Sequence, residues 1–188
     1  MPGAELMGAA TLPQRLLIGV SGSVAALNLP AYLHALRVAG VQRLVAVLTH
    51  TAERFTPPAT LELICDAVCT ESDHGRGHVA LGRWAEQVVV LPATAHLLGC
   101  LAHGLGPNLL ATTLLATDAP ITLVPAMNEV MWRRPAVRRN VDTLRGDGHR
   151  VIEPLPGATY EVASRSIVPG LTIPPPESLV QLLTGVHA

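Results

Sequence analysis

The segment at residues 125–132 combines residue types that could form a binding site. It reads Pro-Ala-Met-Asn-Glu-Val-Met-Trp and follows an apolar run at residues 121–124, which predicts a buried strand. Asn128 would then lie at the carboxyl end of a strand, where open α/β sheets bind their ligands. The two methionines and the tryptophan would form an adaptable apolar wall around its amide. Alternatively, the segment is a loop that only caps the core.

A second candidate is the turn Gly-Val-Ser-Gly-Ser at residues 19–23, between a predicted strand and a predicted helix. Glycines let the backbone approach a phosphate, and a helix N-terminus offers unpaired N–H groups. Ser21 and Ser23 add hydroxyl groups. The turn lacks the three spaced glycines of a dinucleotide site and the lysine of a P-loop, so a single phosphate, as in FMN, fits it better. The alternative is an ordinary turn with a serine cap.

Two threonines and a histidine extend this set. Thr49 and Thr94 each follow a predicted strand, which places them at the same edge as Ser21 and Asn128, although each alone could be a simple helix cap. His78 opens a predicted helix after a polar loop, so it can face the same crevice as an acid–base group. Without the other strand-end residues, a surface or core histidine would be the preferred interpretation.

Other polar clusters give weaker signals. His74 could pair with His78 on a metal, but no third ligand is suitably placed, so no metal site is predicted. Four arginines, Arg133, Arg134, Arg138 and Arg139, could receive a carboxylate or phosphate, although a solvated helix face is the preferred interpretation.

The composition limits the possible functions. The chain has 188 residues, enough for one domain with a real core, and a formal net charge of −1, which argues against nucleic-acid and strongly electrostatic membrane partners. All 13 basic residues are arginines, so mechanisms that need a Schiff-base lysine are excluded. High apolar content with few aromatic residues predicts an oligomer. The sequence shows neither a transmembrane stretch nor a signal peptide, and its three cysteines match no zinc spacing, so we expect a cytoplasmic protein.

The order of predicted elements gives an α/β, Rossmann-like, doubly wound parallel sheet in a single domain. Residues 1–13 are predicted to be a disordered extension, and residues 153–176 a long Pro- and Gly-rich loop. Strands are predicted at residues 15–20, 44–48, 68–69, 87–91, 121–124 and 150–152. Helices are predicted at residues 24–39, with a kink or late start at Pro30, and at 51–55, 61–67, 78–85, 97–104, 108–116, 135–145 and 177–186.

Five motifs in this order resemble the homo-oligomeric flavin-containing cysteine decarboxylases. They are Gly-Val-Ser-Gly-Ser, a Thr-x-x-Ala/Glu-x-Phe strand end, His-x-x-Leu-x-x-Trp-Ala, Pro-Ala-Thr-Ala and Pro-Ala-Met-Asn-x-x-Met-Trp. The family includes phosphopantothenoylcysteine decarboxylases and peptidyl-cysteine decarboxylases of lantibiotic and related peptide pathways, such as the epidermin enzyme, which this chain resembles most. The match covers about residues 15–157.

The resemblance implies that residues 14–188 form an FMN-binding decarboxylase domain, with FMN at a subunit interface of trimers that can assemble into dodecamers. It identifies His78 and Asn128 as catalytic, and Asn128, Met131 and Trp132 as substrate-binding. The implied FMN-binding residues are Gly19, Ser21, Gly22, Ser23, Thr49, Phe55, Pro92, Ala93, Thr94, Ala95 and Met127.

Two departures from the family pattern matter. His96 occupies a position where the family usually has Asn, so a contact to flavin or substrate is altered. The pantothenate-pathway enzymes carry a late cysteine that reduces the enethiol intermediate, whereas this chain has no cysteine after Cys100. A chain without that thiol should stop at the oxidised product.

The sequence therefore predicts FMN-dependent oxidative decarboxylation of the C-terminal cysteine of a ribosomally made precursor peptide. Its product would be a peptidyl aminoenethiol, the precursor of aminovinyl-cysteine. Three alternatives remain: a phosphopantothenoylcysteine decarboxylase of coenzyme A synthesis, a non-catalytic flavin-binding regulatory subunit, and a prenyl-flavin-type transferase.

Overall fold

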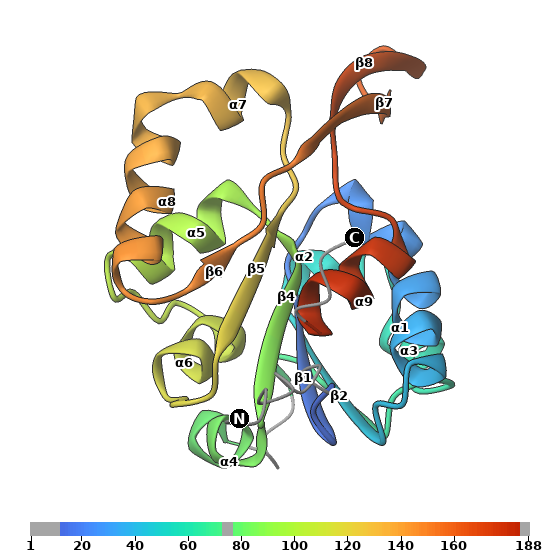
Figure 1. Ribbon diagram of the computed structural model, residues 1–188, viewed down its shortest axis with the longest axis vertical. Helices are drawn as coiled ribbons and strands as arrows, with labels where there is room; N and C mark the ends of the chain where they lie inside the picture. Colours follow the sequence, from blue (N-terminus) through green and yellow to red (C-terminus); the bar gives the residue numbers. More distant parts are fainter. Residues whose placement is uncertain (1–11, 73–76, 185–188) are drawn as a thin grey trace, which may run out of the picture.

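Six parallel strands form the central sheet, in the order β3-β2-β1-β4-β5-β6. The structure, a computed structural model, describes residues 12–72 and 77–184; most of the predicted N-terminal extension and His74 lie outside these residues. The strands are β1 (Arg15–Val20), β2 (Arg43–Leu48), β3 (Ala67–Cys69), β4 (Gln87–Ala93), β5 (Ile121–Pro125) and β6 (Arg150–Val151). The sequence prediction of a doubly wound parallel sheet in one domain is confirmed (Figure 1).

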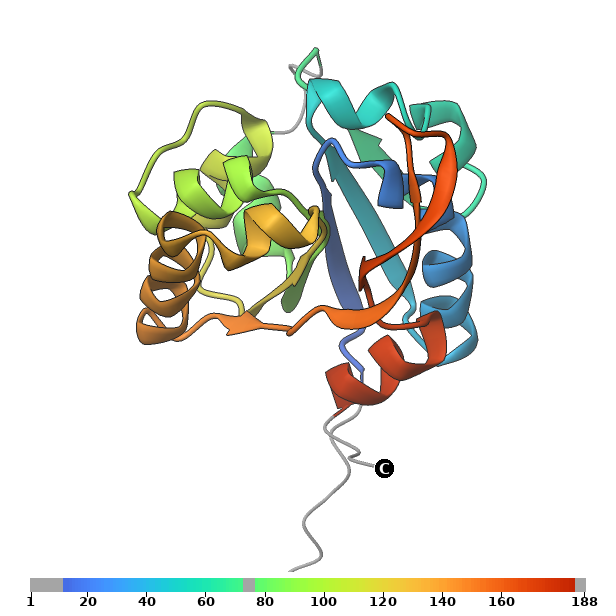
Figure 2. The same cartoon turned by 90° about the horizontal axis from the view of Figure 1, so that it is seen from above.

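Helices cover both faces of this sheet. A short 3-10 helix (Val24–Asn28), α1 (Leu29–Val38), α3 (Pro58–Leu61) and α9 (Pro176–Thr184) contribute to one side, and α4 (His78–Trp84), α5 (Ala95–Ala102), α6 (Leu109–Leu115) and α8 (Pro135–Gly146) to the other (Figure 2). Two short helices, α2 (His50–Glu53) and α7 (Glu129–Arg133), follow the ends of β2 and β5. Because side chains alternate along a strand, β1 sends Leu16 and Ile18 into one core and Leu17 into the other.

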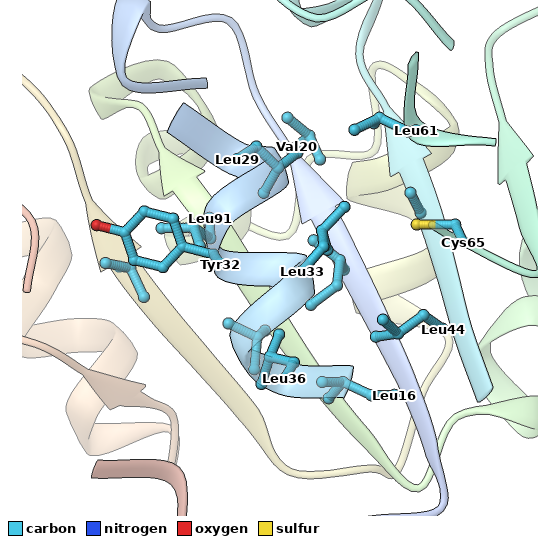
Figure 3. Packing of buried hydrophobic residues seen from close by; sticks show 14 of the residues in the cluster. Leu16, Val20, Leu29, Tyr32, Leu33, Leu36, Leu44, Leu61, Cys65 and Leu91 are labelled. Atoms are coloured by element: carbon cyan, nitrogen blue, oxygen red, sulfur yellow. The ribbon is translucent and has the colours of Figure 1, made fainter. Parts of the chain in front are cut away.

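The core beneath α1 shows how the helix is fixed on the sheet. Tyr32, Leu33 and Leu36 of α1 pack over the side chains of β1, β2 and β4 (Figure 3). The Tyr32 hydroxyl donates a hydrogen bond of 2.7 Å to the carbonyl oxygen of Pro174, just before α9. Burial, with a smaller contribution from the carboxylate of Glu177, raises the pKa of Tyr32 to about 12, so this hydroxyl stays a donor at ordinary pH.

Proline explains two differences from the predicted elements. The predicted helix at residues 24–39 divides, and α1 starts late at Leu29 with Pro30 in its first turn. Pro58, expected to stop a helix, instead begins α3, so the helix predicted at residues 61–67 lies earlier. Proline suits the first turn of a helix because the N–H that it lacks would have had no partner there.

The prediction of a long loop at residues 153–176 is wrong for most of that segment. An antiparallel hairpin occupies it, formed by β7 (Leu155–Glu161) and β8 (Ser166–Thr172). Pro156 and Pro169 argued against strands, but a two-stranded ribbon has two outer edges where the missing N–H costs nothing. Figure 1 shows the hairpin beside α7 at the upper end of the molecule, where β5 also ends.

Candidate functional site

A cavity of about 670 Å³ lies at the carboxyl ends of β1, β2, β4 and β5. It includes the switch point between β1 and β4, where the connections leave the sheet in opposite directions and where such sheets bind ligands. The lining residues predicted from the sequence are Ser21, Gly22, Ser23, Thr49, Thr94, Ala95, Met127 and Met131. The other lining residues are His50, Thr51, Glu71, His96, Leu97, Pro107, Asn108 and Ala126.

Ser21 joins the two strands at the switch point. Its side chain is 3% exposed, and its hydroxyl donates to the carbonyl oxygen of Pro92 at 2.8 Å while accepting from the backbone N–H of Thr94 at 2.9 Å. The Ser21 backbone N–H also bonds to Pro92, at 3.2 Å. Ser21 therefore fixes the floor of the cavity, and its only hydroxyl proton is already used.

Gly22 lies where the turn after β1 meets the start of α2. A Cβ at this position would lie 2.4 Å from Cγ2 of Thr51, closer than real carbon atoms approach. The backbone N–H groups of Gly22 and Ser23 make no hydrogen bond to another described residue. Free N–H groups beside a helix start are suited to an anionic oxygen.

Side chains cap the helices that begin at the cavity. Ser23, Thr49 and Thr94 accept hydrogen bonds from backbone N–H groups of the 3-10 helix, α2 and α5, at 3.3, 3.4 and 3.3 Å. Asn128 caps α7 in the same way, with Oδ1 accepting from the Met131 N–H at 3.0 Å. Each threonine or serine oxygen that accepts a cap bond still has its proton to donate, and the capped Asn128 still has its NH₂ group.

The apolar wall after β5 is smaller than expected. Met127 and Met131 line the cavity, whereas Asn128, between them in the sequence, is exposed and is not one of the lining residues. Trp132 is only 7% exposed, packs in the core and does not line the cavity. Trp132 lies four residues after Asn128, and its indole points to α8, where the Arg138 guanidinium lies 4.6 Å from the ring centroid. Within this chain Trp132 therefore has a packing role, and its contact with substrate stays a prediction.

Four residues predicted to bind FMN do not line the cavity. Gly19 and Ala93 are in strands β1 and β4, and a Cβ at Gly19 would meet Leu110 at 2.6 Å. Pro92 contributes only its carbonyl oxygen, to Ser21. Phe55 packs against the core beneath α1. Gly19, Pro92 and Ala93 shape the ends of β1 and β4, and the residues that directly follow these strands line the cavity.

His78 is separated from the cavity within one chain. It is exposed, makes no hydrogen bond to another described residue and does not line the cavity. Figure 1 shows α4, which His78 begins, at the lower end of the sheet and α7 at the upper end. The expectation that His78 and Asn128 face one crevice of a single chain is not met, because α4 precedes β4 rather than following it.

Comparison with known proteins identifies the family. A family model described as Flavoprotein matches residues 9–183. The chain belongs to the flavoprotein family. Within it, the chain is 38% identical over 177 residues to a mersacidin decarboxylase of Bacillus sp. (strain HIL-Y85/54728), covering 92% of this chain and 90% of that one. It is 33% identical over 168 residues to the coenzyme A biosynthesis bifunctional protein CoaBC of Escherichia coli (strain K12), of which it spans 40%.

Solved structures of flavoprotein-family members have the same fold. The FMN-dependent cysteine decarboxylase SpaF is 38% identical, with a TM-score of 0.76 over 93% of this chain and 97% of that one. A variant of EpiD in complex with the substrate peptide DSYTC is 25% identical, with a TM-score of 0.84 over 90% of this chain and 97% of that one.

The cavity of this flavoprotein contains several residues that the sequence analysis missed. Asn108 caps α6, with Oδ1 2.8 Å from the Ala111 N–H, and Glu71 accepts from the Leu109 N–H at 2.9 Å. Asn before an apolar run is a helix-start signal, so the cap could have been found. The position of the α6 start beside the switch point could not have been found in this way, because it depends on how α5 and α6 pack together.

The lining of the cavity carries few charged side chains. Its titratable groups are Glu71, His50 and His96; no arginine lines it, and the chain has no lysine. Among the described residues no cluster of three or more metal-ligating side chains occurs. Within residues 12–72 and 77–184, no helix combines the length and apolar character needed to cross a bilayer.

Proposed function

We propose that this protein carries out FMN-dependent oxidative decarboxylation of the C-terminal cysteine of a ribosomally made precursor peptide, releasing a peptidyl aminoenethiol. The observation that carries the proposal is a cavity bounded by the Ser-Gly-Ser turn and the Met-Asn-x-x-Met segment, in a chain 38% identical to mersacidin decarboxylase. A free thiol substrate fits a reducing, cytoplasmic setting.

The cavity suits FMN in size and in donor chemistry. About 670 Å³ lies within the range of cofactor sites. The free N–H groups of Gly22 and Ser23, with the hydroxyl protons of Ser23 and Thr49, would hold the phosphate without a charged side chain. Thr94, Ala95 and Met127 would contact the remainder of the flavin. Bound FMN would supply the two-electron acceptor for oxidation of the cysteine.

Asn128 would hold the substrate carboxylate. Its Oδ1 is occupied by the Met131 N–H, so Nδ2 is left to donate hydrogen bonds outward. Met127 and Met131 would exclude water on either side, and a dry surrounding favours loss of a charged carboxylate as neutral carbon dioxide.

His78 would act as an acid–base group on the substrate thiol from a neighbouring subunit. It is exposed and remote from the cavity of its own chain, so a homo-oligomer, either a trimer or a dodecamer of four trimers, would bring it to a second chain. The partners of this chain would then be copies of itself and a precursor peptide ending in Cys.

The β7–β8 hairpin would hold the peptide. Tyr160 and Ile167 form a cross-strand pair and are 51% and 67% exposed. Glu153, just before the hairpin, receives the guanidinium groups of Arg145 at 2.7 Å and Arg138 at 3.5 Å. Partial burial raises the pKa of Glu153, but these hydrogen bonds outweigh it and lower the pKa below its usual value. Glu153 therefore stays ionised and fixes the root of the hairpin to α8.

The coenzyme A alternative is disfavoured by the hairpin. That pathway needs a reducing thiol late in the chain, and residues 101–188 contain no cysteine. A non-catalytic flavin-binding subunit is disfavoured because Asn128 keeps a free NH₂ group beside the cavity.

The test uses purified wild-type protein, FMN and a synthetic peptide ending in Cys. The peptide should lose the mass of carbon dioxide and two hydrogens in mass spectrometry, and a peptide ending in Ser should remain unchanged. Loss of carbon dioxide alone would show a reducing step and favour the coenzyme A pathway. No conversion of the Cys peptide by FMN-loaded protein would refute the proposal.

A further inference from the structure

His96 is the least expected feature of the cavity wall. It lies in the first turn of α5, its imidazole is exposed, and it lines the cavity together with Thr94, Ala95 and Leu97. It belongs neither to the turn at residues 19–23 nor to the segment around Asn128. With no arginine in the lining, the imidazole is one of the few groups there that can donate a strong hydrogen bond to an anion.

A buried thiol holds this imidazole. Nε2 of His96 lies 3.6 Å from Sγ of Cys100, one turn further along α5, and Cys100 is 6% exposed. No described residue bonds to Nδ1 of His96. If the thiol donates to Nε2, the neutral ring carries its proton on Nδ1 and can donate it to a ligand.

The sheet order places His96 between the two halves of the site. Across the cavity the strand ends follow as β2, β1, β4 and β5. The phosphate-type donors Ser23 and Thr49 follow β1 and β2, whereas Asn128 follows β5. His96 follows β4, so it is one strand away from Asn128 on one side and from Ser23 on the other, and two away from Thr49.

We propose that His96 donates a hydrogen bond from Nδ1 to the anionic end of the bound C-terminal cysteine, and that Cys100 is the positioning residue that sets its tautomer. This inference rests on the proposed function. The anionic group is either the carboxylate or the sulfur on which negative charge accumulates as carbon dioxide leaves. A donor fixed before the charge develops stabilises it without reorganisation.

The test compares His96→Ala, His96→Asn and Cys100→Ala with a control on the same helix. His103→Ala, at the C-cap of that helix, is the control, because His103 is exposed, does not line the cavity and its side chain bonds only to the Gly99 carbonyl oxygen in the described structure. His96→Ala should lower kcat/KM about a hundredfold to a thousandfold, as loss of one preorganised donor does. His96→Asn keeps a donor and should recover at least about a tenth of wild-type kcat/KM.

Two binding measurements identify the anion and separate chemistry from folding. FMN affinity, from fluorescence quenching, should stay within about threefold of wild type in every variant, since these residues do not hold the phosphate. A peptide ending in Ser carries the carboxylate but no thiol. If its Kd weakens in His96→Ala, the contact is to the carboxylate; if its Kd holds while kcat falls, the contact is to the sulfur.

Several outcomes would overturn the inference while leaving the proposed function intact. Wild-type turnover in His96→Ala would do so, as would equal losses in His96→Asn and His96→Ala, which would indicate ring packing rather than donation. Unchanged turnover in Cys100→Ala would remove the positioning role. Failure of the wild-type protein to convert a Cys peptide would instead refute the function itself.

Discussion

The two ends of the central sheet differ in what they offer to a ligand. At the carboxyl end, capped helix starts and free N–H groups border a cavity of about 670 Å³, and Asn128, between the lining residues Met127 and Met131, keeps a free NH₂ group. At the other end α4 begins with His78, exposed and without a protein partner among the described residues. The cavity is far from the histidine that the family resemblance implies to be catalytic. This difference is the basis for the proposal that one chain supplies the binding site and another chain supplies His78.

Mixing two inactive variants gives the largest expected effect. His78→Asn and Asn128→Ala should each fall to about a hundredth of wild-type turnover or less, since positioned acid–base groups contribute about a hundredfold to ten-thousandfold. Co-expressed, the two variants should regain activity, because some interfaces pair an intact His78 with an intact Asn128. Turnover of a Cys peptide by the co-purified oligomers provides the measurement.

The control mixes His78→Asn with His78→Ala, which cannot rebuild an intact interface. Continued inactivity of the His78/Asn128 mixture, with both chains present in one oligomer by mass spectrometry, would mean that the site forms within one chain.

A substitution at Gly22 should disrupt only the cavity at the carboxyl end of the sheet. In Gly22→Ala the new Cβ would lie 2.4 Å from Thr51 Cγ2, so the turn must move and its N–H groups lose their alignment. FMN affinity should fall at least about tenfold, a loss of about 1.4 kcal/mol. Gly146→Ala is the matched control, because nothing lies within 4 Å of its added Cβ. Equal FMN affinity of the two variants in a fluorescence titration would contradict the assignment of the phosphate turn.

The smallest effect separates the floor of the cavity from its rim. Ser21→Ala leaves the Thr94 N–H and one interaction of the Pro92 carbonyl unmet in a buried place, which should cost about 1–3 kcal/mol of unfolding free energy. Ser23→Ala removes a long, half-buried cap bond and should cost about 0.5 kcal/mol. Urea denaturation measures both. A larger loss for Ser23 than for Ser21 would show that the floor does not depend on Ser21.

Local patterns predicted most of the strands and the residues at their ends. The apolar runs before Ser21, Thr49, Thr94 and Asn128 are clear in the sequence, and parallel strands bring their carboxyl ends to one edge. The interactions that these side chains make at this edge were harder to predict. Ser21 bonds to residues 71 and 73 positions away, so its role as a link between strands depends on the sheet order.

The remaining errors have specific physical causes. Trp132 was expected in the site because it follows Met131, but one further step around α7 turns it into the core. The hairpin was missed because Pro156, Gly157, Pro169 and Gly170 are poor strand residues, and only an isolated ribbon with free edges tolerates them. Nothing in the sequence around His78 indicates whether it would act in its own chain or in a neighbouring copy.

The hydroxyl of Ser21 has a consequence for how a ligand enters. It pins the ends of β1 and β4 together, so the base of the cavity cannot spread. Any widening must come from the segments above that base, which include the starts of α2, α5, α6 and α7. The hairpin root is tied through Glu153 and Arg138 to α8, and the Arg138 guanidinium lies over Trp132 of α7. Hairpin and α7 should therefore swing as one body, so that the release rate of the flavin and that of the peptide rise and fall together.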